Sequence, residues 1–146
     1  MPPILMDTNI LVYVMDAHNP NQQEKAIALL VTLARKRLGC LSTQNLAEFM
    51  NATINKLHLS PTHMIEQVES WQHIFVVYDL TPQIVLEAAR GVRDHQLSYY
   101  DAQIWAAAQL NQIPVVFSED FQDGQTLEGV QFANPFASAF NLDEWL

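Results

Sequence analysis

Acidic residues stand beside strongly apolar segments at three places in this chain. Asp7 lies inside the run ILMDTNILVY, directly after a stretch with the composition of a buried strand. Glu119, Asp120 and Asp123 follow a second such stretch, IPVVFS, and Glu48 lies in the apolar segment LAEFM. Burying an unpaired charge is costly, so a buried carboxylate must be protonated, paired or bound to a cation. The question is therefore whether these carboxylates share one site.

A group of carboxylates without cysteine or histidine partners favours a hard cation. Mg²⁺ and Mn²⁺ prefer oxygen ligands and keep several bound waters. Such an ion can lower the pKa of a bound water and stabilise charge on a phosphodiester. The only cysteine, Cys40, excludes an intrachain disulfide and a cysteine zinc site, and the spacing of the histidines is not that of metal ligands: positions 18, 58, 63, 73 and 95.

Each acid considered alone also has a simpler interpretation. Asp7 fits a helix cap or turn residue, Asp101 fits a partner of a helix dipole, and Glu48 fits a surface position. The segment SEDFQDG fits a polar turn that ends in glycine. The remaining acids are predicted to be solvated surface residues, among them Asp16, Glu66, Glu69, Glu87, Glu128, Asp143 and Glu144.

Short apolar strands alternate with amphipathic helices along the chain. Strands are predicted at 2–6, 40–43, 74–80, 113–118 and 130–132, and the segment 74–80 has the composition of a buried strand. Helices are predicted within 18–39, 44–57, 60–73, 81–96 and 98–112, several with a capping residue followed by proline. The segment 9–17 fits either the end of a strand or the start of a helix. This alternation predicts an α/β fold whose mainly parallel sheet carries helices on both faces.

Such sheets bind ligands beyond the carboxyl ends of their strands, where the strand order reverses. Asp7 and the acids after Ser118 lie at the same edge if their two strands are parallel. Glu48, in the first turns of the helix after a strand, points to that edge as well. Asp101 lies in the first turn of a later helix, and this pattern alone does not locate it relative to the others.

Length and charge bound the possible partners. The 146 residues are enough for one domain with a real core, and no segment is apolar for long enough to cross a bilayer, so we expect a soluble cytoplasmic protein. The net charge is −9: residues 1–73 carry −1 and residues 74–146 carry −8. A protein that binds nucleic acid by neutralising phosphates would show the opposite. Either metal ions mediate phosphate contacts, or the acidity attracts a basic partner protein.

Four blocks occur in order across nearly the whole chain: ILMDTNILVY, STQNLAEFMNA, LSYYDAQIWAAA, and VVFSEDFQDG followed by GVQFANPF. Together they resemble PIN-domain nucleases, and more narrowly the VapC-type toxins of bacterial toxin–antitoxin pairs. The resemblance implies a single PIN-like domain over residues 1–146. It also implies a three-layer α/β/α fold around a mainly parallel sheet of four to five strands.

The resemblance further implies an acidic set around one or two Mg²⁺ or Mn²⁺ ions, made of Asp7, Glu48, Asp101 and Asp120. By position, Asp7 and Asp101 would be direct ligands, Glu48 would bind metal or orient the attacking water, and Asp120 would hold a second, weaker site. Glu119 and Asp123 are alternatives to Asp120. The resemblance also implies that hydrogen bonds from Thr8, Asn9 and Ser118 would orient these acids.

As function, the resemblance implies a metal-dependent endoribonuclease that works as a homodimer and is inhibited by an antitoxin protein inserting a segment into the acidic site. Two other classes compete. A catalytically silent PIN fold would serve as a protein- or RNA-binding module, although all four acidic positions are present. A phosphatase with an aspartyl nucleophile would require a second aspartate where Asn9 stands and a lysine near the last motif, and no lysine follows Lys56.

Overall fold

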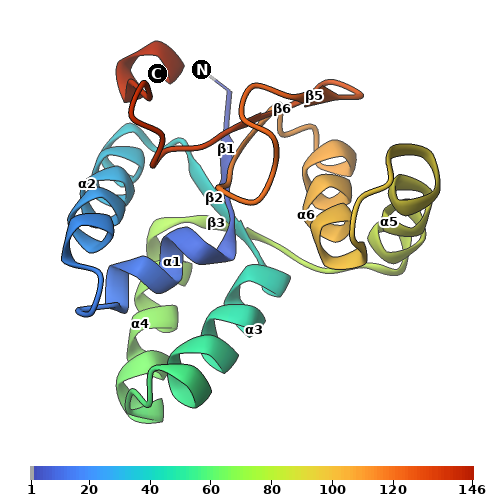
Figure 1. Cartoon of the computed structure of the whole chain (residues 1–146). Coiled ribbons are helices and arrows are strands. Elements are labelled where there is room, and N and C mark those ends of the chain that lie inside the picture. Colours follow the sequence, from blue (N-terminus) through green and yellow to red (C-terminus); the bar gives the residue numbers. More distant parts are fainter. Residues whose placement is uncertain (1) are drawn as a thin grey trace.

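A computed structural model describes residues 2–146 and contains a six-stranded sheet with helices on both faces (Figure 1). The strands are β1 (Ile4–Met6), β2 (Gly39–Ser42), β3 (Val76–Tyr78), β4 (Val115–Phe117), β5 (Thr126–Leu127) and β6 (Val130–Ala133). The helices are α1 (Thr8–Met15), α2 (Pro20–Lys36), α3 (Thr43–Asn51), α4 (Pro61–Ile74), α5 (Pro82–His95) and α6 (Tyr99–Leu110). The π-helix η1 (Ala52–Lys56) extends α3, and the 3₁₀-helix η2 (Leu142–Trp145) lies near the C-terminus.

Capping residues define several helix starts. The Ser42 hydroxyl accepts from the Asn45 backbone N–H, and the Asn45 side chain accepts from the Ser42 backbone in return, which forms a capping box at the start of α3. Thr81 accepts from Ile84 at the start of α5. Asn19 precedes Pro20 but makes no capping bond to α2. Short polar signals therefore set where the helices leave the sheet.

The strand order is β3-β2-β1-β4-β6-β5, with β1 at the centre. β1 is parallel to β2 and to β4, and β6 is parallel to β4. The chain leaves β1 toward β2 on one side and reaches β4 on the other, so the strand order reverses between β1 and β4. Ligand sites of open α/β sheets lie at this kind of reversal, and Asp7 follows β1 directly.

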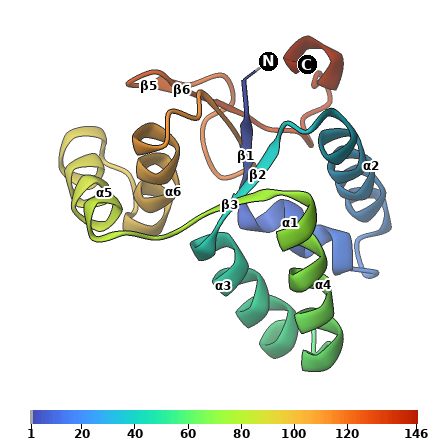
Figure 2. The ribbon, with the colours of Figure 1, turned by 180° about the vertical axis from the view of Figure 1, so that it is seen from behind.

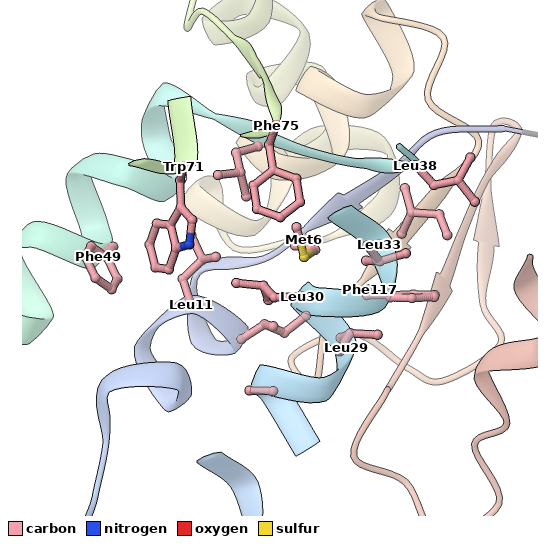
Figure 3. Packing of buried hydrophobic residues seen from close by; sticks show 14 of the residues in the cluster. Met6, Leu11, Leu29, Leu30, Leu33, Leu38, Phe49, Trp71, Phe75 and Phe117 are labelled. Carbon is pink, nitrogen blue, oxygen red and sulfur yellow. The ribbon is translucent and has the colours of Figure 1, made fainter. Parts of the chain in front are cut away.

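Alternation along the strands builds two cores. Ile4 and Met6 of β1 pack with α1 to α4 on one face, where Phe49, Trp71 and other large side chains meet (Figure 3). Leu5, between them, packs on the other face with α5 and α6. Figures 1 and 2 show the same division, with α1 to α4 on one side of the sheet and α5 and α6 on the other. The predicted α/β/α architecture is confirmed.

Three local features differ from the sequence-based expectations or resolve them. The segment 119–129, between the strands predicted at 113–118 and 130–132, contains the two-residue strand β5, which pairs antiparallel with β6 and brings the sheet to six strands rather than four or five. The strand at 74–80 was expected to be buried, but β3 is an edge strand and Val76 is 60% exposed. The ambiguous segment after Asp7 is the helix α1.

Over residues 2–146, no helix combines the length and the apolar character needed to span a membrane.

Candidate active site

Asp7 lies at the junction of β1 and α1 and is 5% exposed. Its backbone N–H donates to the Phe117 carbonyl of β4 at 3.0 Å, which joins the ends of the two central strands. Its carboxylate accepts from the Thr8 backbone N–H at 2.7 Å and from the Ser118 hydroxyl at 2.7 Å. Asp7 is therefore the N-cap of α1, as the simpler interpretation had it, and also the innermost acid at the strand reversal.

The surroundings of Asp7 disfavour its charge. Burial raises the pKa of Asp7 to about 7, and the negative charges of Asp120 and Glu48 add to the rise. The hydrogen bonds from Ser118 and Thr8 work in the opposite direction but do not offset the burial. A cation beside this carboxylate would remove the cost of its ionised form.

Asp120 comes next to Asp7 through the segment that follows β4. Its backbone N–H donates to the Ser118 hydroxyl at 3.1 Å, and its carboxylate accepts from the Asn9 side chain at 3.0 Å. Burial raises the pKa of Asp120, and the charge of Asp101 raises it further. Ser118 thus bonds to both acids, and Asn9 orients the second of them.

The two alternatives to Asp120 have other partners. The Glu119 carboxylate accepts from the Tyr13 hydroxyl at 2.8 Å, and burial together with this bond raises the pKa of Tyr13 to about 12. The Asp123 carboxylate accepts from the Asn134 backbone N–H at 2.9 Å, within the turn before β5. Geometry therefore favours Asp120 among the three acids.

Glu48 is oriented by a chain of polar side chains from three elements. The Gln44 amide donates to the Glu48 carboxylate at 3.0 Å, and the Thr8 hydroxyl lies 3.3 Å from the same oxygen. Gln103 of α6 donates to the Gln44 carbonyl oxygen at 2.8 Å, and Asn45 donates to the Thr8 hydroxyl at 3.2 Å. These bonds connect α3 to α1 and α6 and hold Glu48 toward Asp7.

The four acids named from the sequence line one open pocket of about 820 Å³: Asp7, Glu48, Asp101 and Asp120. Asp101 reaches it from the first turn of α6. Thr8, Asn9, Gln44 and Gln103 also line the pocket, whereas Glu119 and Asp123 do not. Sequence reasoning alone could not place Asp101; α6 packs against α5, β4 and β6, and hydrogen bonds from Gln44 to the Tyr100 carbonyl and from Gln103 to Gln44 join its first turns to α3.

The oxygen ligands of this pocket suit a divalent cation, but its acidic side chains are not close enough together to enclose one. In the described part of the chain, no three Asp, Glu, His or Cys side chains are grouped closely enough to hold an ion as they stand. Mg²⁺, however, is commonly held by one or two carboxylates together with waters and substrate phosphate. The oxygen-only donor set and the raised pKa values of Asp7 and Asp120 suit such an ion.

Sequence reasoning missed the amides that support Glu48. Gln44 stands four residues before Glu48, a spacing that places both on one helix face, and Asn45 occupies the third helical position after the cap Ser42. Both signals were available in STQNLAEF. Gln103 gave no local signal, because its contact with Gln44 spans 59 positions.

Two acids predicted to be solvated, Asp16 and Glu87, are not. Asp16 is 8% exposed and accepts from the His18 backbone and from the Asn19 side chain, which explains why Asn19 does not cap α2. Glu87 is partly buried and forms a salt bridge with Arg90, whereas Glu128, which also binds Arg90, is exposed as predicted. All three lie outside the pocket.

Known structures resemble this chain closely in fold. A toxin–antitoxin complex from Klebsiella pneumoniae contains a chain with 19% identity and a TM-score of 0.68, and the match covers 91% of this chain and 98% of that chain. The DNA-bound VapBC from Salmonella typhimurium matches with 18% identity, a TM-score of 0.66, and coverage of 92% and 99%. VapC20 from Mycobacterium tuberculosis, described as a sarcin–ricin loop cleaving toxin, matches with 17% identity, a TM-score of 0.68, and coverage of 88% and 98%.

At the level of sequence, the search of curated proteins gave no match. The family model of the PIN domain matches residues 4–122, which include β1 with Asp7, α3 with Glu48, α6 with Asp101, and Asp120 after β4. This match covers well over half of the chain and contains all four pocket acids, so the chain belongs to the PIN domain family.

Proposed function

We propose that this chain is a metal-dependent endoribonuclease that acts as the toxin of a type II toxin–antitoxin pair. One observation carries the nuclease proposal: four carboxylates from four separate segments line a single pocket, and the innermost of them, Asp7, is buried and forms no salt bridge within residues 2–146. A chain gains no stability from such an arrangement. It is reasonable for a site that takes up a cation together with a phosphodiester.

In this proposal Asp7 and Asp101 are the direct metal ligands, Asp120 contributes to a second, weaker position, and Glu48 binds metal or orients the attacking water. A bound Mg²⁺ or Mn²⁺ supplies a water of lowered pKa and stabilises negative charge on the phosphate oxygens. Supporting side chains keep the acids aimed, as outer-sphere partners do in metal sites generally.

The residues of the chain have separate tasks in this site. Thr8 and Ser118 fix both oxygens of Asp7, so its carboxylate cannot rotate away from the pocket. Gln44 fixes one oxygen of Glu48 and leaves the other able to accept a proton or a water hydrogen. Asn9 holds Asp120 beside the start of α1. The hydrolysis of the phosphodiester then depends on positioning and charge.

The toxin role, the partner and the cellular location rest on likeness to known proteins. The similar chains from Klebsiella pneumoniae and Salmonella typhimurium were determined with antitoxin partners. The net charge of −8 on residues 74–146 suits a basic antitoxin segment. Exposed apolar side chains on α2 and α4, such as Ile27, Val31 and Ile65, offer area for an antitoxin or for a homodimer. We place this activity in the cytoplasm, where RNA is available.

A cleavage assay tests the nuclease proposal directly. Labelled single-stranded and hairpin RNAs are incubated with the wild type in Mg²⁺ or Mn²⁺, with the wild type in EDTA, and with Asp101→Asn in metal. A matched control is Asp143→Asn, an exposed aspartate outside the pocket. We expect cleavage only with metal, a loss of about 100-fold or more in Asp101→Asn, and no loss in Asp143→Asn.

The opposite outcome is informative as well. If the wild type cleaves none of the RNAs and calorimetry detects no Mg²⁺ or Mn²⁺ binding, the chain is a catalytically silent PIN fold. Metal binding that survives Asp101→Asn unchanged would remove Asp101 from the ligand set.

A further inference from the structure

One basic side chain lines the acidic pocket. Of the Lys and Arg residues within 2–146, Lys56 alone belongs to the pocket wall, together with Glu48 and Ala52 of the same helical segment. Lys56 is exposed, and the described part of the chain provides it with no salt bridge. The four acids of the pocket therefore leave this ammonium group unpaired.

The other basic residues are placed or engaged elsewhere. Arg90 binds Glu87, Asp94 and Glu128, and Arg93 binds Asp94, all outside the pocket. The remaining four lie on α2 or at its end: Lys25, Arg35, Lys36 and Arg37. RNA that enters the pocket consequently meets one cationic side chain of this chain, at a known position.

A π-helical turn determines that position. In a regular α-helix, Lys56 would stand about 80° around the axis from Glu48, because eight residues overshoot two turns. η1 instead has the wider π geometry: the Leu57 N–H donates to the Ala52 carbonyl, five residues earlier, at 3.1 Å. A π turn contains more residues than an α turn, so each residue rotates less about the helix axis and Lys56 lies closer to the direction of Glu48. Glu48, Ala52 and Lys56 therefore all face the pocket.

The turn is anchored from the core side. Thr53 is fully buried, and its hydroxyl donates to the Phe49 carbonyl at 2.8 Å. Ile54 packs against the core beside it. Single π turns inside α-helices occur frequently at functional sites, and this one carries the only ammonium group of the pocket.

We infer that Lys56 is a substrate-binding residue that holds a backbone phosphate of the RNA beside the one being cleaved. This inference rests on the proposed ribonuclease function. Lys56 stands two helical turns beyond Glu48 on the same pocket wall, with Ala52 between them. A neighbouring phosphate of the same strand is the anion that it would hold there, and the repulsion from a chain of net charge −9 makes one placed cation valuable.

Steady-state cleavage kinetics over a series of NaCl concentrations test this role. The variants are Lys56→Met, Lys56→Arg, and the control Lys25→Met on the exposed side of α2, each checked for an unchanged melting temperature. Lys56→Met should raise KM about three- to tenfold with kcat nearly unchanged. It should also lower the slope of log KM against log [NaCl] by about 0.7, the value for one single-strand phosphate contact. Lys56→Arg should restore both.

Failure of the two proposals can be told apart. If the wild type cleaves RNA in metal but Lys56→Met keeps the wild-type KM and salt slope, the Lys56 inference is wrong and the nuclease stands. If kcat falls while KM and the salt slope stay, Lys56 does not hold a flanking phosphate. If the wild type cleaves no RNA, both fail together. If Lys25→Met changes KM and the salt slope as much as Lys56→Met does, the effect comes from net charge and not from the position of Lys56.

Discussion

Two groups of carboxylates in this molecule have opposite surroundings. Where α5 meets the turn between β5 and β6, Glu87, Asp94 and Glu128 gather around Arg90, whose guanidinium lies 2.6 Å, 3.3 Å and 2.9 Å from them. The same guanidinium stacks on Trp105, with its carbon 5.4 Å from the ring centre. In this group, the chain itself provides the cation.

The pocket acids have no such partner. Over residues 2–146, none of Asp7, Glu48, Asp101 and Asp120 forms a salt bridge. The pKa values follow this difference. Hydrogen bonds from Arg90 lower the pKa of Glu87 and Glu128, whereas burial raises the pKa of Asp7 and Asp120. Arg90 neutralises the carboxylates of the first group, whereas the carboxylates of the second group remain available to a bound cation.

Asp7→Asn is the strongest test of this contrast, because activity and stability should move in opposite directions. Cleavage should fall by about 100-fold or more with the loss of a ligand. The metal-free protein, however, should gain up to about 4 kcal/mol at pH 8, since each pKa unit of the shift from 3.8 to about 7 is worth about 1.4 kcal/mol. Urea unfolding in EDTA measures it, with Asp143→Asn as control. A less stable Asp7→Asn that still cleaves RNA at the wild-type rate would mean that Asp7 is a structural cap only.

The wild type should show the same effect through pH. Because the folded pKa of Asp7 lies above its unfolded value, the folded state binds more protons between pH 3.8 and about 7, and this contribution to stability is lost as pH rises through that window. Saturating Mg²⁺ or Mn²⁺ should offset the loss, by about 2.7 kcal/mol at 100 times Kd. Thermal melts from pH 4 to 8, compared with Asp7→Asn, isolate this group. If the melting temperatures of the wild type and Asp7→Asn change with pH in the same way, Asp7 does not cause the pH dependence.

Substitutions after β4 sharpen the boundary of the pocket group. Asp120→Asn should lower cleavage about 10- to 100-fold, as the loss of a weaker ligand or of its support does. Glu119→Gln and Asp123→Asn should change it little, because Tyr13 and the Asn134 backbone engage these acids outside the pocket. Rates at fixed Mn²⁺ compare the three. A Glu119→Gln defect as large as that of Asp120→Asn would assign the last acidic position to Glu119.

Arg90→Met tests the other group, with the smallest expected effect. Hydrogen bonds from Arg90 lower the pKa values of Glu87 and Glu128, which stabilises the fold above the ordinary carboxyl range, and this stabilisation is lost as pH falls through the lowered pKa values. Arg90→Met should therefore lower the melting temperature at pH 7 but not at pH 3, with RNA cleavage unchanged. Arg35→Met is the control, at an exposed arginine of α2 that forms no salt bridge within residues 2–146. A cleavage defect in Arg90→Met would show that this cluster contributes to RNA binding.

The parts of the site that could be predicted follow from strand ends. Asp7 and Asp120 come directly after apolar strands, and parallel strands bring such positions to one edge. Glu48 follows by the same rule through the helix after β2. The position of Asp101 came only from resemblance, since the crossover from β3 through α5 to α6 is too long for local patterns to orient.

What could not be predicted depends on long-range packing. The apolar composition of 74–80 does not reveal that β3 has a neighbour on one side only. The bond between Gln103 and Gln44 and the salt bridge between Arg90 and Glu128 join residues 59 and 38 positions apart. The π turn at Lys56 is likewise invisible in NATINKL, because a helix-compatible sequence does not state how many residues its turn contains.

The central position of β1 has a consequence for synthesis. Asp7 and Asn9 are made before their partners Ser118 and Asp120, which come 111 positions later. At about 5 to 20 residues per second, a nascent chain waits roughly 5 to 20 s between the two events. A chain that does not yet include β4 and the residues after it therefore cannot assemble the acidic pocket.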